Sequence, residues 1–121
     1  MSGLKTAAIS LLVLSLLVLA GPSFSAAKPT PLVATVGPAF TISLTKAGKK
    51  VTTLKPGRYS ITVRDRSSMH NFHLTGPGVN RRSTVAEVRT LRPWVVTFKK
   101  GTYRYVCDPH AATMKGSFKV R

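Results

Sequence analysis

Acidic residues are the clearest shortage in this sequence. Among 121 residues there are three Asp or Glu against 19 Lys or Arg, a formal net charge of +16. Such an imbalance favours anionic partners, although it does not identify them. The basic residues are spread along the whole chain, and no recognised nucleic-acid-binding module is visible. We therefore interpret them as a solvated cationic surface and expect no specific nucleic-acid partner.

Cysteine, histidine and methionine are also scarce. Cys107 is the only cysteine, so no internal disulfide can form, and a lone cysteine in an exported protein indicates a reactive or ligated thiol. The chain has three His and three Met, one of which is the initiator. It therefore lacks Met- or His-rich tracts. So few histidines cannot form a second His-rich metal centre, so we expect that it is not an enzyme.

The sequence has no apolar run of ordinary membrane-spanning length. Its apolar stretch, residues 7–20, has fourteen residues, whereas a span needs about 20. The stretch follows Lys5 and is followed by a Gly-Pro pair and small residues, which is the pattern of a secretory signal peptide. We predict a signal peptide over residues 1–25, cleaved after Ser25 or alternatively after Ala27. An uncleaved anchor is the competing interpretation.

Cleavage would leave a periplasmic or secreted mature protein that does not span the membrane. Removal of Lys5 with the signal peptide would leave 18 basic and three acidic residues, a net charge of +15. Residues 26–38 are rich in Pro, Ala and Thr and are interpreted as an extended leader, which becomes the first strand near its end in one interpretation. The domain itself is expected over residues 39–121.

The rest of the chain has an all-β pattern. Apolar and polar residues alternate, as in strands with one buried and one solvated face, over residues 40–45, 58–64, 94–98, 102–107 and 117–121. Short Gly- and Pro-containing turns separate these runs. The least clear stretch includes residues 84–88 as a candidate short strand. We expect a Greek-key β-sandwich of about seven strands.

Three candidate metal ligands lie close together near the C-terminus. Cys107, His110 and Met114 supply a thiolate, an imidazole and a thioether within eight residues. Soft sulfur ligands together with imidazole select copper, and one Cys, two His and a distant Met form the blue-copper set. The spacing requires a strand that ends at Cys107 and a tight loop that returns the other two side chains. It predicts one copper ion and a second histidine ligand from elsewhere.

Two histidines compete for that place. Residues 70–74 are interpreted as a further strand, with His70 at its end. His70 shares one face of it with Phe72 and Leu74, which are expected core residues, whereas Asn71 and His73 have the opposite parity. We therefore predict that His70 points inward as the ligand, and that Asn71 and His73 face outward.

The sequence resembles the cupredoxins at these positions. Residues 101–110 are similar to the copper-binding end of the plastocyanin and amicyanin group, His70-Asn71 to their upstream ligand and its neighbour, and residues 114–117 to azurin. The resemblance implies a Greek-key sandwich with one type 1 copper, which transfers single electrons between Cu(I) and Cu(II). It also implies that Tyr103 forms a tyrosine corner.

The sequence also departs from these relatives. Val106 stands where plastocyanin commonly has an exposed Tyr beside an acidic docking patch, and three acidic residues cannot form such a patch. We therefore expect an acidic redox partner that docks near His110, where Pro109 and its alanine neighbours form an apolar patch. Asp108 would face Asn71 and is expected to lower the reduction potential by favouring Cu(II).

These observations favour an exported, monomeric electron carrier. The alternative is a copper-binding protein for buffering or delivery without an electron-transfer partner. A cationic module for acidic polymers, with copper incidental, is compatible with the charge, but no spacing supports it.

Overall fold

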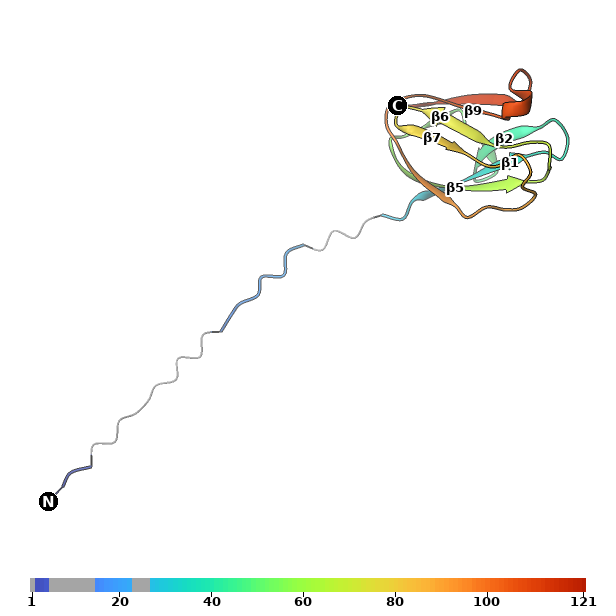
Figure 1. Ribbon diagram of the computed structural model, residues 1–121. Helices are drawn as coiled ribbons and strands as arrows, with labels where there is room; N and C mark the ends of the chain where they lie inside the picture. Colours follow the sequence, from blue (N-terminus) through green and yellow to red (C-terminus); the bar gives the residue numbers. More distant parts are fainter. Residues whose placement is uncertain (1, 5–14, 23–26) are drawn as a thin grey trace.

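The computed structural model describes residues 2–4, 15–22 and 27–121 (Figure 1). The predicted cleavage after Ser25 and most of the apolar stretch 7–20 lie outside the described residues. Residues 15–22 are exposed and have no regular secondary structure. Within the described residues, no helix has both the length and the apolar character needed to cross a membrane.

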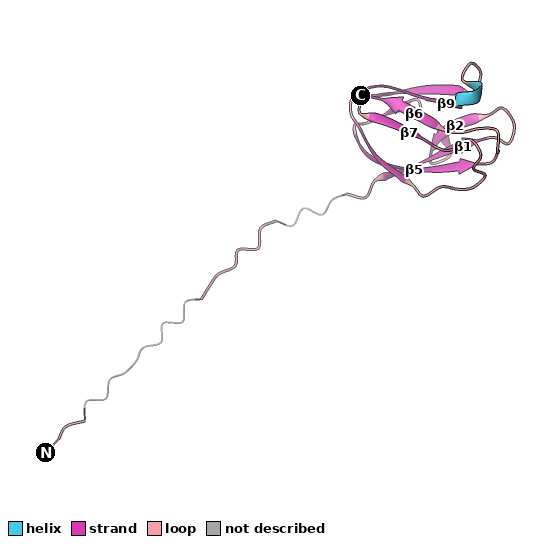
Figure 2. Ribbon diagram, viewed as in Figure 1, coloured by secondary structure: helices cyan, strands magenta, loops and turns pink. Residues whose placement is uncertain are grey.

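The folded part consists of two five-stranded mixed sheets (Figure 2). The first has the order β3-β2-β1-β5-β8, formed by Lys49–Lys50, Ile42–Lys46, Thr30–Val36, Gly57–Asp65 and Trp94–Phe98. The second has the order β4-β10-β9-β6-β7, formed by Thr53–Leu54, Lys115–Val120, Gly101–Val106, His73–Gly76 and Val79–Arg82. The pairs β1–β5 and β10–β4 are parallel, and all other pairs are antiparallel. A 3-10 turn, η1 (Asp108–His110), follows β9.

The apolar residues of the alternating pattern are buried between the two sheets. On β8 the side chains of Trp94, Val96 and Phe98 are buried and those between them are exposed. The Phe98 ring lies 4.7 Å from Tyr103 of β9 and 5.3 Å from Phe118 of β10, measured between centroids. Aromatic rings from both sheets thus meet in one core, and removing their large apolar surfaces from water stabilises the sandwich.

Several expectations differ from the observed strands. The described residues form ten strands rather than about seven, because short pairings such as β3 and β4 have too few residues to show a periodicity. Residues 84–88 do not form a strand; they belong to the loop between β7 and β8, in which only Thr90 makes an isolated bridge, to Arg64. Within the segment 26–38, β1 pairs with β2 on one side and β5 on the other, so it is a central strand of the fold.

Phe40 also differs from the expectation, because it is not a core strand residue. β2 begins only at Ile42, and the side chain of Phe40 is 63% exposed. The preceding residues form a tight loop, in which the Gly37 N–H donates to the Thr41 carbonyl at 2.9 Å. Alternation over residues 40–45 therefore predicted the strand but placed its start two residues too early.

Tyr103 ties the turns at one end of the sandwich together. Its ring is fully buried, and its hydroxyl accepts from the Lys99 N–H at 3.1 Å and lies 2.9 and 3.1 Å from the carbonyls of Lys99 and Pro77, which are acceptors. This is the backbone contact pattern of a tyrosine corner. The ring lies directly on Gly76, where an added Cβ would be 2.2 Å from Tyr103 Cδ1.

We expect Tyr103→Phe to lower the free energy of unfolding by about 1–3 kcal/mol, because it removes the hydroxyl that bonds the Lys99 N–H and the Lys99 and Pro77 carbonyls in a partly buried turn. Urea unfolding of the metal-free protein measures this loss. Tyr59→Phe is the control, since the Tyr59 hydroxyl makes one bond, to the Lys55 carbonyl at 2.7 Å, and should cost less. Equal losses in the two variants would contradict the role given to Tyr103.

Candidate metal centre

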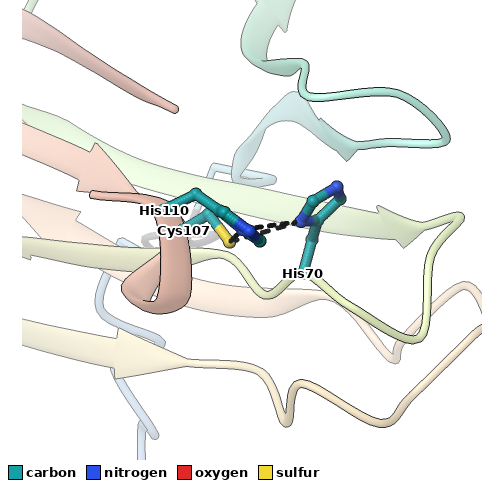
Figure 3. Close-up of side chains that lie close together, drawn as sticks. All are labelled: His70, Cys107 and His110. Carbon is teal, nitrogen blue, oxygen red and sulfur yellow. Dashed lines mark hydrogen bonds between the residues drawn. The ribbon is translucent and has the colours of Figure 1, made fainter. Parts of the chain in front are cut away.

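Three of the predicted ligands meet at one end of the sandwich (Figure 3). His70 precedes β6, Cys107 follows β9 and His110 ends η1, and their ligand atoms all lie within 4.8 Å of one another. Cys107 Sγ is 3.7 Å from His70 Nδ1 and 3.6 Å from His110 Nδ1, and the two Nδ1 atoms are 3.1 Å apart. Cys107 is fully buried and His70 is 2% exposed.

These separations fit one shared metal ion. Ligands about 2.0 Å (nitrogen) and about 2.3 Å (sulfur) from a common ion lie roughly 3 to 4 Å from one another in trigonal or tetrahedral geometry. The hydrogen bond between the two imidazole Nδ1 atoms requires a proton on one of them, and a metal ion would replace that proton. A thiolate with two imidazoles is a donor set suited to copper.

The loop after Cys107 has a compact backbone. The His110 N–H donates to the Cys107 carbonyl at 3.0 Å, the Met114 N–H to the His110 carbonyl at 2.8 Å, and the Cys107 N–H to the Met114 carbonyl at 3.0 Å. The backbone of Met114 thus pairs with that of Cys107, and the Met114 residue is buried, at 1% exposed. Ligation by the Met114 thioether stays a prediction.

His73 lies outside this cluster and is engaged elsewhere. Its Nδ1 is 2.7 Å from Asp108 Oδ1 and its Nε2 is 2.8 Å from Asn80 Oδ1. Residues 70–72 form a loop, since β6 begins at His73. His70 lies in the cluster, but strand parity does not explain its position, because only His73 lies in the strand.

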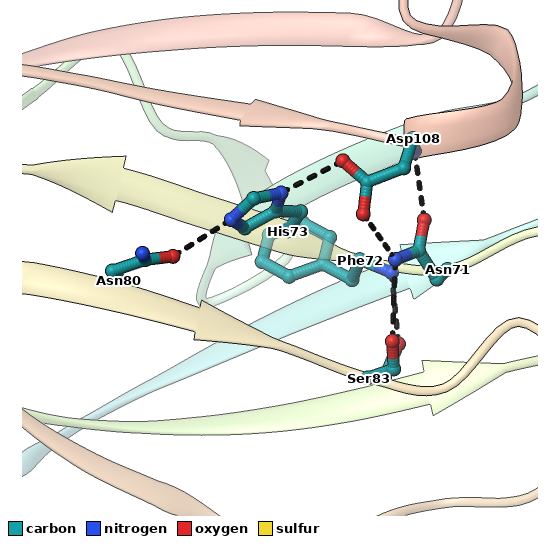
Figure 4. Close-up of polar contacts among 6 residues, drawn as sticks. All are labelled: Asn71, Phe72, His73, Asn80, Ser83 and Asp108. Carbon is teal, nitrogen blue, oxygen red and sulfur yellow. Dashed lines mark hydrogen bonds and ion pairs between the residues drawn. The ribbon is translucent and has the colours of Figure 1, made fainter.

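Asn71 does not face outward as predicted; it is 2% exposed and links the two ligand segments (Figure 4). Its Oδ1 accepts from the Asp108 N–H at 2.8 Å, and its Nδ2 donates to Asp108 Oδ2 at 2.7 Å and to the Ser83 carbonyl at 3.2 Å. The Ser83 hydroxyl oxygen in turn accepts from the Phe72 N–H at 2.8 Å. Parity fails here because the loop allows consecutive side chains to be buried.

Asp108 is held as a carboxylate by this network. Partial burial opposes its ionisation, but the hydrogen bonds from Asn71 and His73 and the positive charges of His73 and Arg82 together hold the pKa of Asp108 below its ordinary value. A negative charge therefore stays next to the ligand Cys107 at neutral pH.

Phe40 lies at the metal centre, although the alternation over residues 40–45 predicted it as a core residue. Its ring meets the His70 ring edge-on at 5.4 Å and the His110 ring at 5.0 Å between centroids. The loop that carries it packs closely, since a Cβ on Gly37 would lie 2.9 Å from Ser67 Cβ and 3.5 Å from His70 Cδ2. The Gly-Pro pair at residues 37–38 is the sequence signal for this loop.

Comparisons with known proteins agree with this geometry. The sequence profile of the family described as copper binding proteins, plastocyanin/azurin family, matches residues 40–121. Reduced rusticyanin is similar in structure, with 25% identity, a TM-score of 0.52 and 79% of each chain covered. A reduced amicyanin variant has 19% identity and a TM-score of 0.52, with 78% of this chain and 86% of that chain covered.

A chain from the structure of a heme-copper terminal oxidase dimer is also similar, with 19% identity and a TM-score of 0.54. The match covers 75% of this chain and only 63% of the length of that chain. No curated protein matched the chain in sequence.

The two histidines allow a matched test of the metal site. We expect His70→Gln to lose most of the copper affinity, because it removes a donor atom. His73→Gln should change that affinity by no more than about 10–100-fold, the usual effect of a residue outside the ligand set. Competition with a chelator of known affinity measures both variants, and a larger loss in His73→Gln than in His70→Gln would contradict the site.

Proposed function

Because the chain belongs to the plastocyanin/azurin family of copper-binding proteins, we propose that it carries single electrons between redox partners outside the cytoplasm. Its one copper ion would be held by His70, Cys107, His110 and Met114. The main support is the convergence of a buried thiol and two imidazoles within 4.8 Å. Export is proposed from the predicted signal peptide.

The ligand frame suits electron transfer because it can hold one geometry in two redox states. Bound copper supplies the one-electron Cu(I)/Cu(II) couple. Cys107 is fixed by backbone bonds on both sides of the loop, and Asn71 fixes the His70 segment to the Cys107 segment. Little rearrangement of these residues is therefore needed when the charge of the site changes.

His110 is the proposed port for the electron. It is partly exposed, unlike His70, and its neighbours Pro109, Ala111 and Ala112 are exposed small or apolar residues. The exposed Phe40 ring lies against the same imidazole. Small apolar side chains allow close approach of a partner, and a limited contact area suits a brief encounter.

The proposal involves one copper ion and no catalysis. The remaining histidine, His73, contacts Asp108 and Asn80 through its two ring nitrogens. Both possible donor atoms of His73 are therefore engaged in hydrogen bonds rather than in binding a second ion. We further propose that the mature protein is a monomer with an acidic redox partner, because its own surface is strongly cationic.

Addition of Cu(II) to the purified domain should give an intense visible colour and a reversible one-electron couple, with copper retained through repeated cycles. Cys107→Ser should remove the colour, because a hydroxyl is a much poorer soft-metal ligand than a thiolate. Visible spectroscopy, redox titration and metal analysis after cycling make the measurement.

A colourless or irreversible product would contradict the electron-carrier proposal. Release of Cu(I) to a chelator during each reduction would instead favour the alternative, a protein for copper buffering or delivery.

Asp108→Asn should raise the reduction potential, because it removes a negative charge that favours Cu(II) while keeping the shape of the side chain. A nearby charge in a partly solvated site contributes about 1 kcal/mol, which corresponds to roughly 40 mV for one electron. Glu87→Gln is the control, since Glu87 pairs with Arg89 and contacts no ligand segment. Cyclic voltammetry measures both, and an unchanged potential in Asp108→Asn would refute the charge effect.

A further inference from the structure

Four arginines line a cleft beside the metal centre, and their arrangement points to the contact surface of the redox partner. We propose that this arginine cleft, formed around Arg81, Arg82, Arg89 and Arg92, docks an acidic segment of the partner protein. The proposal rests on the electron-transfer function proposed above and adds the surface and the chemistry of recognition.

The cleft lies where the edges of the two sheets approach. Its volume is about 520 Å³, and it is lined by residues of β7, of β8 and of the loop 83–93 that joins them. β7 is an edge strand of one sheet and β8 an edge strand of the other. The cleft is therefore built on the rigid frame of the sandwich, and its floor includes the buried Trp94.

The charge of the cleft is almost entirely positive. All four arginines are exposed, and the one carboxylate in the lining, Glu87, lies 3.3 Å from Arg89 Nη2. The Arg81 guanidinium is 5.2 Å from the centre of the Trp94 ring. Stacking on an aromatic ring restricts a guanidinium, and planar guanidinium groups bind carboxylates through paired hydrogen bonds. An acidic peptide segment is a complementary occupant.

The cleft continues toward the proposed electron port. A second hollow of about 500 Å³ shares Arg82, Ser83 and Thr84 with it and reaches Asp108 and Pro109, the residues before His110. Ser83 is also bonded to Asn71 and to the Phe72 backbone. A partner held in the cleft would therefore lie beside the port without any movement of the ligand segments.

A second cationic hollow provides an internal control. It has a volume of about 910 Å³ and is lined by Lys46, Lys55 and Arg58 among others, with no acidic residue. Arg121 is also in its lining, and the C-terminus lies at the end of the sandwich opposite η1 (Figure 2). Charge alone would favour this hollow over the arginine cleft, because five cationic residues and no Asp or Glu line it, against four arginines and Glu87 in the cleft. The proposed docking needs the arginine cleft instead.

The test uses the copper-loaded, reduced protein and a decaglutamate peptide as the probe. Titration of the ¹⁵N-labelled protein should shift the amide signals of the cleft and its loop first. Arg81→Gln/Arg89→Gln/Arg92→Gln should weaken peptide binding at least tenfold. Lys46→Gln/Lys55→Gln/Arg58→Gln removes the same number of charges and should weaken it less than threefold.

Electron transfer gives a second readout of the same surface. Hexacyanoferrate(III) takes one electron from the Cu(I) protein and becomes hexacyanoferrate(II), and this anionic oxidant should react more slowly with the arginine variant than with the lysine variant. Decaglutamate should slow the wild-type reaction by competition. If the triple arginine variant does not fold, Arg89→Gln/Arg92→Gln against Lys46→Gln/Lys55→Gln makes the same comparison.

Equal loss of binding in the two variants, or peptide shifts centred on the lysine-lined hollow, would overturn the proposal. Tighter binding of a 20-nucleotide single-stranded DNA than of decaglutamate in the cleft would overturn it in favour of a nucleic-acid partner. A reversible couple at an electrode tests the electron-carrier function separately. If that couple is present and the cleft does not bind the peptide, only the docking proposal fails.

Discussion

Two hydrogen bonds between Asn71 and Asp108, one from the Asp108 backbone N–H and one to its carboxylate, join two parts of the chain that are 37 residues apart in sequence. One part carries His70 and the other Cys107 and His110, so the relative position of all three donors depends on this contact. Both polar atoms of the Asn71 side chain, Oδ1 and Nδ2, are hydrogen-bonded, and Asn71 is 2% exposed. Water cannot easily replace such a buried, fully paired side chain. The position of the donors is therefore supported by bonds that do not use the donor atoms themselves.

The strands and core of the sandwich hold the two segments joined by the Asn71–Asp108 contact in place. β9 and β6 are neighbours in one sheet, with His73 opposite Val106, so the strands that lead to the two ligand segments are already in register. The Phe72 and Tyr105 rings stack at 5.4 Å between centroids and fill the core just beneath the site. A displacement of either segment would have to disturb this packing, and close-packed interiors resist such changes. Core packing and ligand geometry are thus parts of one constraint.

The sequence was most informative where side chains repeat or lie close along the chain. Cys107, His110 and Met114 could be grouped because one short loop carries them, and the strand alternation gave the all-β class. Loops have no periodicity, so neither the burial of Asn71 nor the position of Phe40 over the histidines could be derived. The central position of β1 in its sheet could not be predicted either, because its parallel pairing with β5 joins residues 29 positions apart. Such non-local pairing leaves no local pattern.

The scarcity of acidic residues acquires a structural meaning once their positions are known. Asp108 is bonded to Asn71 and His73, and Glu87 is paired with Arg89. Asp65 is buried, which raises its pKa, and it accepts from the Ser67 N–H at 3.1 Å. Glu87 offsets Arg89, and the other two carboxylates are engaged or buried, so most of the cationic surface has no acidic partner. The electrostatic field around the protein is therefore set by Lys and Arg. One cationic surface region differs from another in how rigidly its side chains are held. The arginine cleft combines a guanidinium held over an aromatic ring with a connection to the ligand loop. Rigid, localised charge orients an encounter, whereas scattered lysines only attract.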